Sequence, residues 1–158
     1  MKKLFPALFL ACLSITPASA DFVDGIYAYS RGEYHQAYMT MRSIAETSDH
    51  GLAQYYLAMM YLRGEGVEQS YEDAAKWFRK SAEQRIKQAQ YRLAELYMKG
   101  RGVPKDYEYA YAWYRVGAEH KHKKSISALT SAKENLSLEE LEEAEKLSRK
   151  LINQYGPE

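Results

Sequence analysis

The sequence has almost no cysteine, no apolar run long enough to cross a membrane, and no excess of one charge. Its 158 residues include one cysteine, and 22 basic side chains nearly balance 21 acidic ones. Without a charge excess, no global field attracts nucleic acid. Without a disulfide framework, the fold depends on packing alone. Hydrophobic residues at 46% and charged residues at 27% are typical of a folded globular domain.

Residues 1–20 have the three parts of a secretory signal peptide. Two lysines follow the initiator methionine, a short apolar run comes next, and Ala-Ser-Ala at 18–20 is a small-residue cleavage site. The run is too short for a bilayer, which needs about 20 residues. We expect cleavage after Ala20 and a periplasmic or secreted mature chain without an integral membrane segment; an uncleaved anchor is the alternative. The lone Cys12 would leave with the leader.

The mature part, residues 21–158, contains an internal repeat. Residues 53–88 align without a gap on residues 89–124, a shift of 36 positions (89 − 53 = 36). A repeat of this length indicates a stack of supersecondary units that bury their apolar faces against one another. Both copies share Ala53/Ala89, Gln54/Gln90, Leu57/Leu93, Tyr61/Tyr97, Gly64/Gly100, Gly66/Gly102 and Trp77/Trp113. We expect the recurring tryptophans to pack between helices.

Each copy has the pattern helix, glycine loop, helix. Gln54, Leu57 and Tyr61 lie on one face of a helix with 3.6 residues per turn. Gly64 ends this helix, because glycine readily adopts the positive φ of a helix C-terminus. Ser70 is the expected N-cap of the second helix. In the second copy Gly100 and Asp106 take the same roles.

Partial units flank the two full repeats. A degenerate repeat spans 22–52, and its leading helix is expected at about 22–30. A partial repeat and a cap span 125–155, where Ser137 and Glu140 form a capping box. The expected apolar stripe of the last helix consists of Leu138, Leu141, Ala144, Leu147 and Leu151. Its glutamate-rich opposite face suits the end of a stack, where no neighbour follows.

The repeat resembles the Sel-one-like repeat (SLR) family, a relative of the tetratricopeptide repeats. The motif Ala-Gln-x2-Leu-Ala-x2-Tyr-x2-Gly-x-Gly-Val occurs at 53–67 and 89–103, and Tyr-x2-Ala-x2-Trp-aromatic-x3-Ala-Glu follows at 71–83 and 107–119. The resemblance implies an all-α fold, a right-handed α-solenoid of antiparallel helix pairs with a C-terminal capping helix. It also implies a non-enzymatic adaptor that binds a protein or peptide in its concave groove.

The alternative is a cell-wall-active enzyme, or one that binds or hydrolyses β-lactams, on the same repeat fold. Some exported members of the family are linked to that activity, and they carry a disulfide-paired hairpin in each repeat. The corresponding positions here hold no cysteine, and no nucleophile lies in a known catalytic motif. His120 and His122 are two residues apart, on different sides of a helix, and cannot readily share a metal. We therefore expect no enzyme, no catalytic residue, no cofactor and no metal site.

Two surfaces are candidates for binding a partner. In tetratricopeptide-like stacks a second stripe on each first helix lines the groove. Tyrosine, methionine and arginine, which are enriched in protein interfaces, occur on it. The expected groove residues are Tyr55, Met59, Leu62, Arg63, Tyr91, Glu95, Met98 and Lys99; the alternative is that they only pad adjacent helices. The basic run at 120–124 is either a docking patch for an acidic partner or a solvated helix end.

Overall fold

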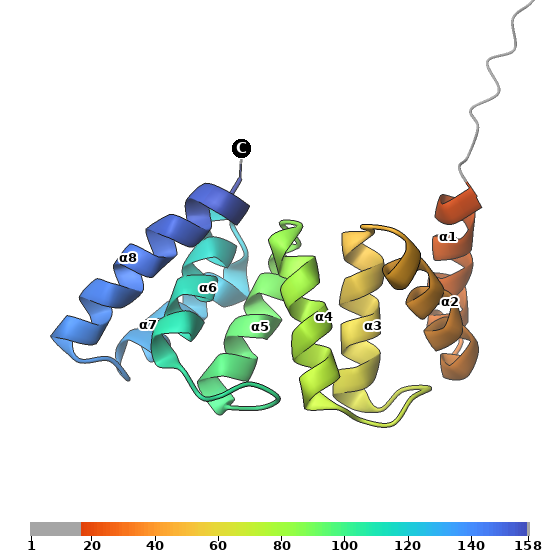
Figure 1. Cartoon of the computed structure of the whole chain (residues 1–158), viewed down its shortest axis with the longest axis horizontal. Helices are drawn as coiled ribbons and strands as arrows, with labels where there is room; N and C mark the ends of the chain where they lie inside the picture. Colours follow the sequence, from red (N-terminus) through yellow and green to blue (C-terminus); the bar gives the residue numbers. More distant parts are fainter. Residues whose placement is uncertain (1–16, 158) are drawn as a thin grey trace, which may run out of the picture.

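The computed structural model describes residues 17–157, in which every regular element is an α-helix. Figure 1 shows the helices side by side in a row, from α1 at one end to α8 at the other. Successive helices pack as pairs, α1 with α2, α3 with α4 and α5 with α6. The fold is the expected α-solenoid. The helices are α1 Pro17–Ser30, α2 Tyr34–Thr47, α3 Gly51–Arg63, α4 Tyr71–Glu83, α5 Lys87–Lys99, α6 Tyr107–Glu119, α7 Lys123–Lys133 and α8 Leu138–Tyr155.

Local sequence sets the helix ends within the repeats. Gly64 and Gly100 cap α3 and α5 with positive φ angles of 70° and 62°. Ser70 and Asp106 cap α4 and α6, and each side chain accepts a hydrogen bond from a backbone N–H three residues later. All four predicted caps are confirmed. These caps satisfy backbone groups that a helix leaves without partners at its ends.

The second glycine of each loop has an additional role that the sequence did not predict. Gly66 lies against the backbone carbonyl of Tyr34 at the start of α2, and Gly102 lies against that of Tyr71 at the start of α4. A Cβ at either glycine would collide with that carbonyl. The glycine loops therefore join one helix pair to the preceding pair.

The core runs without a break through the stack. Leu57, Phe78 and Leu93 are fully buried, and the two repeat tryptophans, Trp77 and Trp113, are 6% and 2% exposed. Packing of both tryptophans between helices is confirmed. Rings of this size contribute much of the apolar area that stabilises a small domain.

The amino-terminal helix is longer than predicted. It begins at Pro17 rather than at residue 22. Proline fits the first helical position, because its missing N–H has no intrahelical acceptor there. Most of the expected signal peptide, residues 1–16, lies outside the described residues. Across residues 17–157 no helix combines the length and hydropathy that a bilayer span requires.

The carboxyl-terminal helix α8 packs mainly against α6, as does α7. Its capping box between Ser137 and Glu140 is confirmed. The buried part of α8 is Ala144, Ser148 and Leu151, whereas Leu138 is 84% exposed. Including Leu138 in the apolar stripe was wrong, because the start of α8 lies away from α6 and the fully buried side chains begin only at Ala144 (Figure 1).

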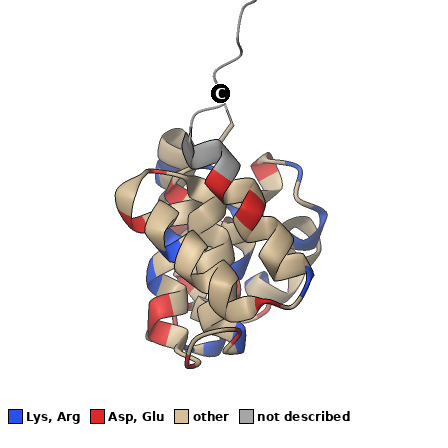
Figure 2. Ribbon diagram, turned by 90° about the vertical axis from the view of Figure 1, so that its right-hand side faces the viewer, with Lys and Arg blue, Asp and Glu red and all other residues tan. Residues whose placement is uncertain are grey.

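Acidic and basic residues are both scattered around the stack. Figure 2 looks along the row from the α1 end, and both colours occur around the ribbon without one of them dominating. This distribution agrees with the formal net charge of +1. An excess of one charge, where it occurs, is therefore confined to one part of the surface.

Candidate protein-binding groove

Three hollows follow one another over α3, α5 and α7, the first helices of successive repeats. The first is lined by Leu62, Arg92, Glu95, Lys99 and neighbouring residues, and the second by Tyr55, Gln88, Tyr91, Arg92, His122 and Lys124. The third is lined by Tyr91, Lys123, Lys124, Ser127 and Ala128. Arg92 borders the first two hollows, and Tyr91 and Lys124 border the last two, so the three adjoin one another. We call this row of adjoining hollows the first-helix groove.

The structure brings five of the expected groove residues together. Tyr55 and Tyr91 line the second hollow, and Leu62, Glu95 and Lys99 line the first. They come from α3 and α5, whose equivalent positions are 36 residues apart in the chain. Five of the eight residues selected by the helical period therefore line the hollows.

Three other expected residues lie elsewhere. Met59 is only 4% exposed and belongs to the core, so its inclusion among contact residues was wrong. Arg63 donates to the Tyr29 hydroxyl at 2.9 Å and lies 3.6 Å from Glu65, which directs it toward α1. Met98 is half-buried against the core. A stripe of residues predicted from the sequence of one helix does not show which of those residues neighbouring helices cover.

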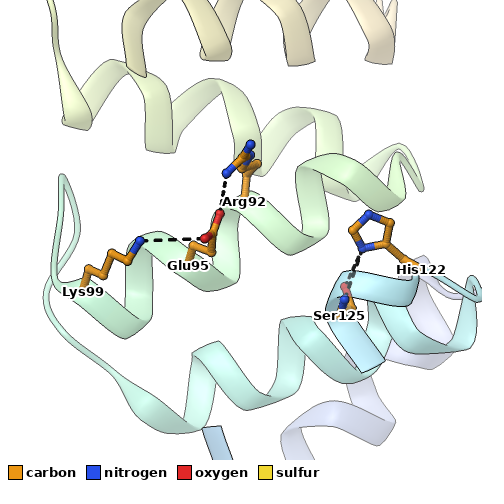
Figure 3. Close-up of polar contacts among 5 residues, drawn as sticks. All are labelled: Arg92, Glu95, Lys99, His122 and Ser125. Carbon is orange, nitrogen blue, oxygen red and sulfur yellow. Dashed lines mark hydrogen bonds and ion pairs between the residues drawn. The ribbon is translucent and has the colours of Figure 1, made fainter. Parts of the chain in front are cut away.

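Arg92 is the central groove residue that the sequence reasoning missed. Its Nη1 donates to Glu95 at 2.7 Å, and Lys99 Nζ lies 3.8 Å from the other oxygen of the same carboxylate. Figure 3 shows Glu95 between the two basic side chains on α5. Arg92 is three residues before Glu95 and so shares its helix face. That spacing was the available signal for Arg92.

Tyr91 lines both the second and the third hollow. Its ring lies 5.7 Å from that of Tyr114 and 5.3 Å from that of His122, measured between centroids. Burial raises the pKa of the Tyr91 hydroxyl, and the Glu95 carboxylate raises it further. Tyr91 is therefore a neutral hydrogen-bonding group that presents part of its ring to the groove.

His122 lies directly before α7, at the edge of the groove. Its Nδ1 accepts the backbone N–H of Ser125, which makes it the N-cap, and lies 2.9 Å from the Ser125 hydroxyl (Figure 3). Burial lowers the pKa of the imidazole, and the cations of Lys87, Lys124 and Arg92 lower it further. The cap and the surrounding positive charge both favour the neutral ring.

The basic run at 120–124 does not form one patch. His120 Nε2 lies 3.0 Å from the backbone oxygen of Tyr155, and His122 caps α7. Only Lys123 and Lys124 project from the run as groove-lining, exposed cations.

Within residues 17–157 no three His, Cys, Asp or Glu side chains are grouped as metal ligands. The groove offers tyrosine faces and charged donors, which suit binding of an extended chain.

The paired helices, stacked in a row with a groove along one side, have the architecture of a helical-repeat protein. The family model of the Sel1 repeat matches residues 51–85 and 87–122. Residues 51–122 therefore contain two Sel1 repeats, and the expected resemblance is confirmed. Sel1 repeats usually form protein-interaction modules and are generally non-enzymatic.

Two solved structures are similar to this chain. One is a protective antigen present in uropathogenic Escherichia coli strains that displays an SLR fold, with 30% identity, a TM-score of 0.84 and 89% of this chain covered. The other is a Sel1 repeat protein from Oxalobacter formigenes, with 30% identity, a TM-score of 0.67 and 84% covered. The matches span 31% and 55% of those proteins' own lengths. A comparison with curated proteins gives no match.

Proposed function

We propose that this protein is an exported binding module that holds a segment of a protein or peptide partner in the first-helix groove. The observation that carries the proposal is the row of three adjoining hollows over α3, α5 and α7. An extended segment can follow such a row, because its side chains must contact several repeats in turn. The Sel1 repeats support a role in protein interaction, but they do not identify the surface that binds the partner, which has to be tested.

The lining of the groove supports the same role. Tyr55 and Tyr91 are half-buried, so each ring is held by packing while part of it stays accessible. Such preorganised aromatic side chains lose little conformational entropy on binding. Arg92 provides directed donors beside them.

Export is supported by the amino-terminal sequence. The two lysines, the short apolar run and the Ala-Ser-Ala site at 18–20 form a signal-peptide pattern. Cleavage after Ala20 would remove the first turn of α1 and leave Asp21 at the start of the helix. An acidic residue is favourable there because it complements the helix dipole.

A bulky, uncharged substitution inside the groove tests the binding site. Gln88 is exposed on α5 and lines the second hollow, so the Gln88→Trp side chain would fill it without disturbing the core. Asn153→Trp, at an exposed position on α8, is the matched control. Each tagged protein is used to capture partners from a periplasmic extract, which are identified by mass spectrometry.

We expect the unmodified protein and Asn153→Trp to capture the same partner, and Gln88→Trp to lose it. Circular dichroism melts of all three proteins establish that each is folded. Full capture by folded Gln88→Trp would show that the partner binds outside the groove.

A further inference from the structure

The first-helix groove concentrates positive charge in a nearly neutral chain. Its three hollows are lined by five basic side chains and one acidic side chain: Arg92, Lys99, Arg101, Lys123 and Lys124 against Glu95. The whole chain has 22 basic and 21 acidic residues. The groove therefore has a local excess of positive charge that the net charge of the chain does not reveal.

The repeat shows that the fold does not need two of these charges, those of Arg92 and Lys124. Arg92 occupies the position held by Tyr56 in the preceding copy, and Lys124 the position held by Gln88, each 36 residues earlier. Both pairs lie at matching places on first helices of the same stack. Because the solenoid forms with uncharged residues there, the cations add something other than packing.

Two of the cations also oppose local helix electrostatics. Lys123 and Lys124 are the first two residues of α7. The amino-terminal end of a helix carries partial positive charge, which disfavours a cation in the first turn. These lysines weaken α7 slightly, so their presence fits a role in binding.

The groove already holds one carboxylate. Glu95 is engaged by Arg92 at 2.7 Å and by Lys99 at 3.8 Å. Arg92 is fixed in turn by its position 5.7 Å from the Tyr91 ring centroid. A guanidinium has five N–H donors, and the bond to Glu95 engages Nη1. This geometry shows how the groove receives carboxylate groups.

We propose that the partner segment is acidic, with several carboxylates that follow the row from Lys99 through Arg92 to Lys124 and Lys123. The proposal rests on the proposed function, since it names the chemistry of the segment that the groove binds. Carboxylates pair with the cations, while Tyr55 and Tyr91 contact the apolar parts of the segment. Paired charges of this kind guide association and set the register of the bound chain.

A charge-neutralising pair tests this chemistry. Fluorescein-labelled octaglutamate is titrated into the purified protein at low salt, and binding is followed by fluorescence anisotropy. The test variant is Lys123→Gln with Lys124→Gln. The control is Lys76→Gln with Lys80→Gln, which makes the same change in net charge at exposed positions of α4, outside the groove.

We expect the Lys123/Lys124 variant to bind the probe about tenfold more weakly, and the α4 control to bind within about twofold of wild type. Binding should weaken as salt is added. The melting temperature of the Lys123/Lys124 variant should be unchanged or higher, because the opposing charges at the helix start are gone. If Lys123 and Lys124 served only to stabilise the fold, replacing them would lower the melting temperature.

Three results would overturn the proposal. The first is an equal loss in both variants, which indicates a general charge effect. The second is octalysine or labelled oligodeoxythymidine binding as tightly as octaglutamate. The third is a wild-type protein that sediments as a dimer and a Lys123/Lys124 variant that is monomeric, since the occupant is then the acidic α8 of a second copy.

The two proposals fail separately. If folded Gln88→Trp captures the natural partner fully, the groove is not the binding site. If Gln88→Trp loses the partner while the Lys123/Lys124 variant retains it at wild-type strength, the groove stands and only the acidic character of the partner is overturned.

Discussion

Trp113 stacks on Tyr155, with ring centroids 5.7 Å apart and ring planes inclined by 20°. Trp113 lies on α6 in the second full repeat, and Tyr155 is the last residue of α8. The backbone oxygen of Tyr155 also accepts the side-chain amide of the buried Gln90 at 3.2 Å. The end of the capping helix is therefore joined to both α5 and α6.

The first prediction concerns this contact. Trp113→Ala removes a nearly fully buried ring and should lower the free energy of unfolding by about 3 to 5 kcal/mol. Urea unfolding followed by circular dichroism measures the change. Tyr27→Ala, at a position 61% exposed on α1, is the control and should change stability by less than about 1 kcal/mol. If Trp113→Ala lost no more stability than the control, the packing of α8 would not depend on its contact with the Trp113 ring.

The second prediction separates backbone strain from steric contact in the glycine loops. Gly32 and Gly102 have positive φ angles of 77° and 69°. An added Cβ meets nothing within 4 Å at Gly32 but collides with the carbonyl of Tyr71 at Gly102. Gly32→Ala should cost about 1 kcal/mol for the left-handed backbone, and Gly102→Ala about 1 to 3 kcal/mol more.

Thermal and urea unfolding of the two glycine variants give the comparison. Equal losses would contradict the contact between the Gly102 loop and α4. Since both variants place alanine at a positive φ, the difference between them reports the collision alone.

The third prediction follows from the lowered pKa of His122. The unfolded chain takes up this proton near the ordinary value of 6.5, whereas the folded protein takes it up only at lower pH. Between these two pKa values the unfolded state binds more protons, so stability falls as pH falls through the window. The groups facing the ring are Tyr91, Lys87 and Arg92 from α5 and Lys124 and Ser125 from α7.

His122→Asn keeps an N-cap acceptor but removes the titration. The loss of stability on acidification below pH 6.5 should therefore be smaller in this variant than in wild type. Urea unfolding at a series of pH values measures both curves, and the other histidines contribute equally to each. Parallel curves would show that the His122 pKa is the same in the folded and unfolded states.

The fourth prediction concerns the amino terminus. Intact-mass measurement of protein from the periplasm should give a chain that begins at Asp21, because the Ala-Ser-Ala site precedes it. An Ala18→Leu substitution, which removes a small residue from the site, should slow processing and leave more of the longer form. A mature wild-type species that retains Met1 would contradict signal cleavage.

Much of the fold could be predicted from the sequence because its determinants are local. The 36-residue spacing fixes the order of helices, and glycine and polar caps such as Gly64 and Ser70 fix where they end. These effects depend on backbone geometry within a few residues. The position of Trp113 in the core also followed from its recurrence in the repeat.

Tertiary packing decided the surface. Met59 occupies an expected contact stripe and is buried, while Arg92 was passed over and lies at the centre of the groove. A stripe on one helix specifies direction, but exposure depends on which neighbours cover it. Arg92 and Lys124 are 32 positions apart (124 − 92 = 32) and border one hollow only because α5 and α7 pack in adjacent repeats. The sequence by itself determined the helices and their order, and stacking of the repeats determined which charges meet.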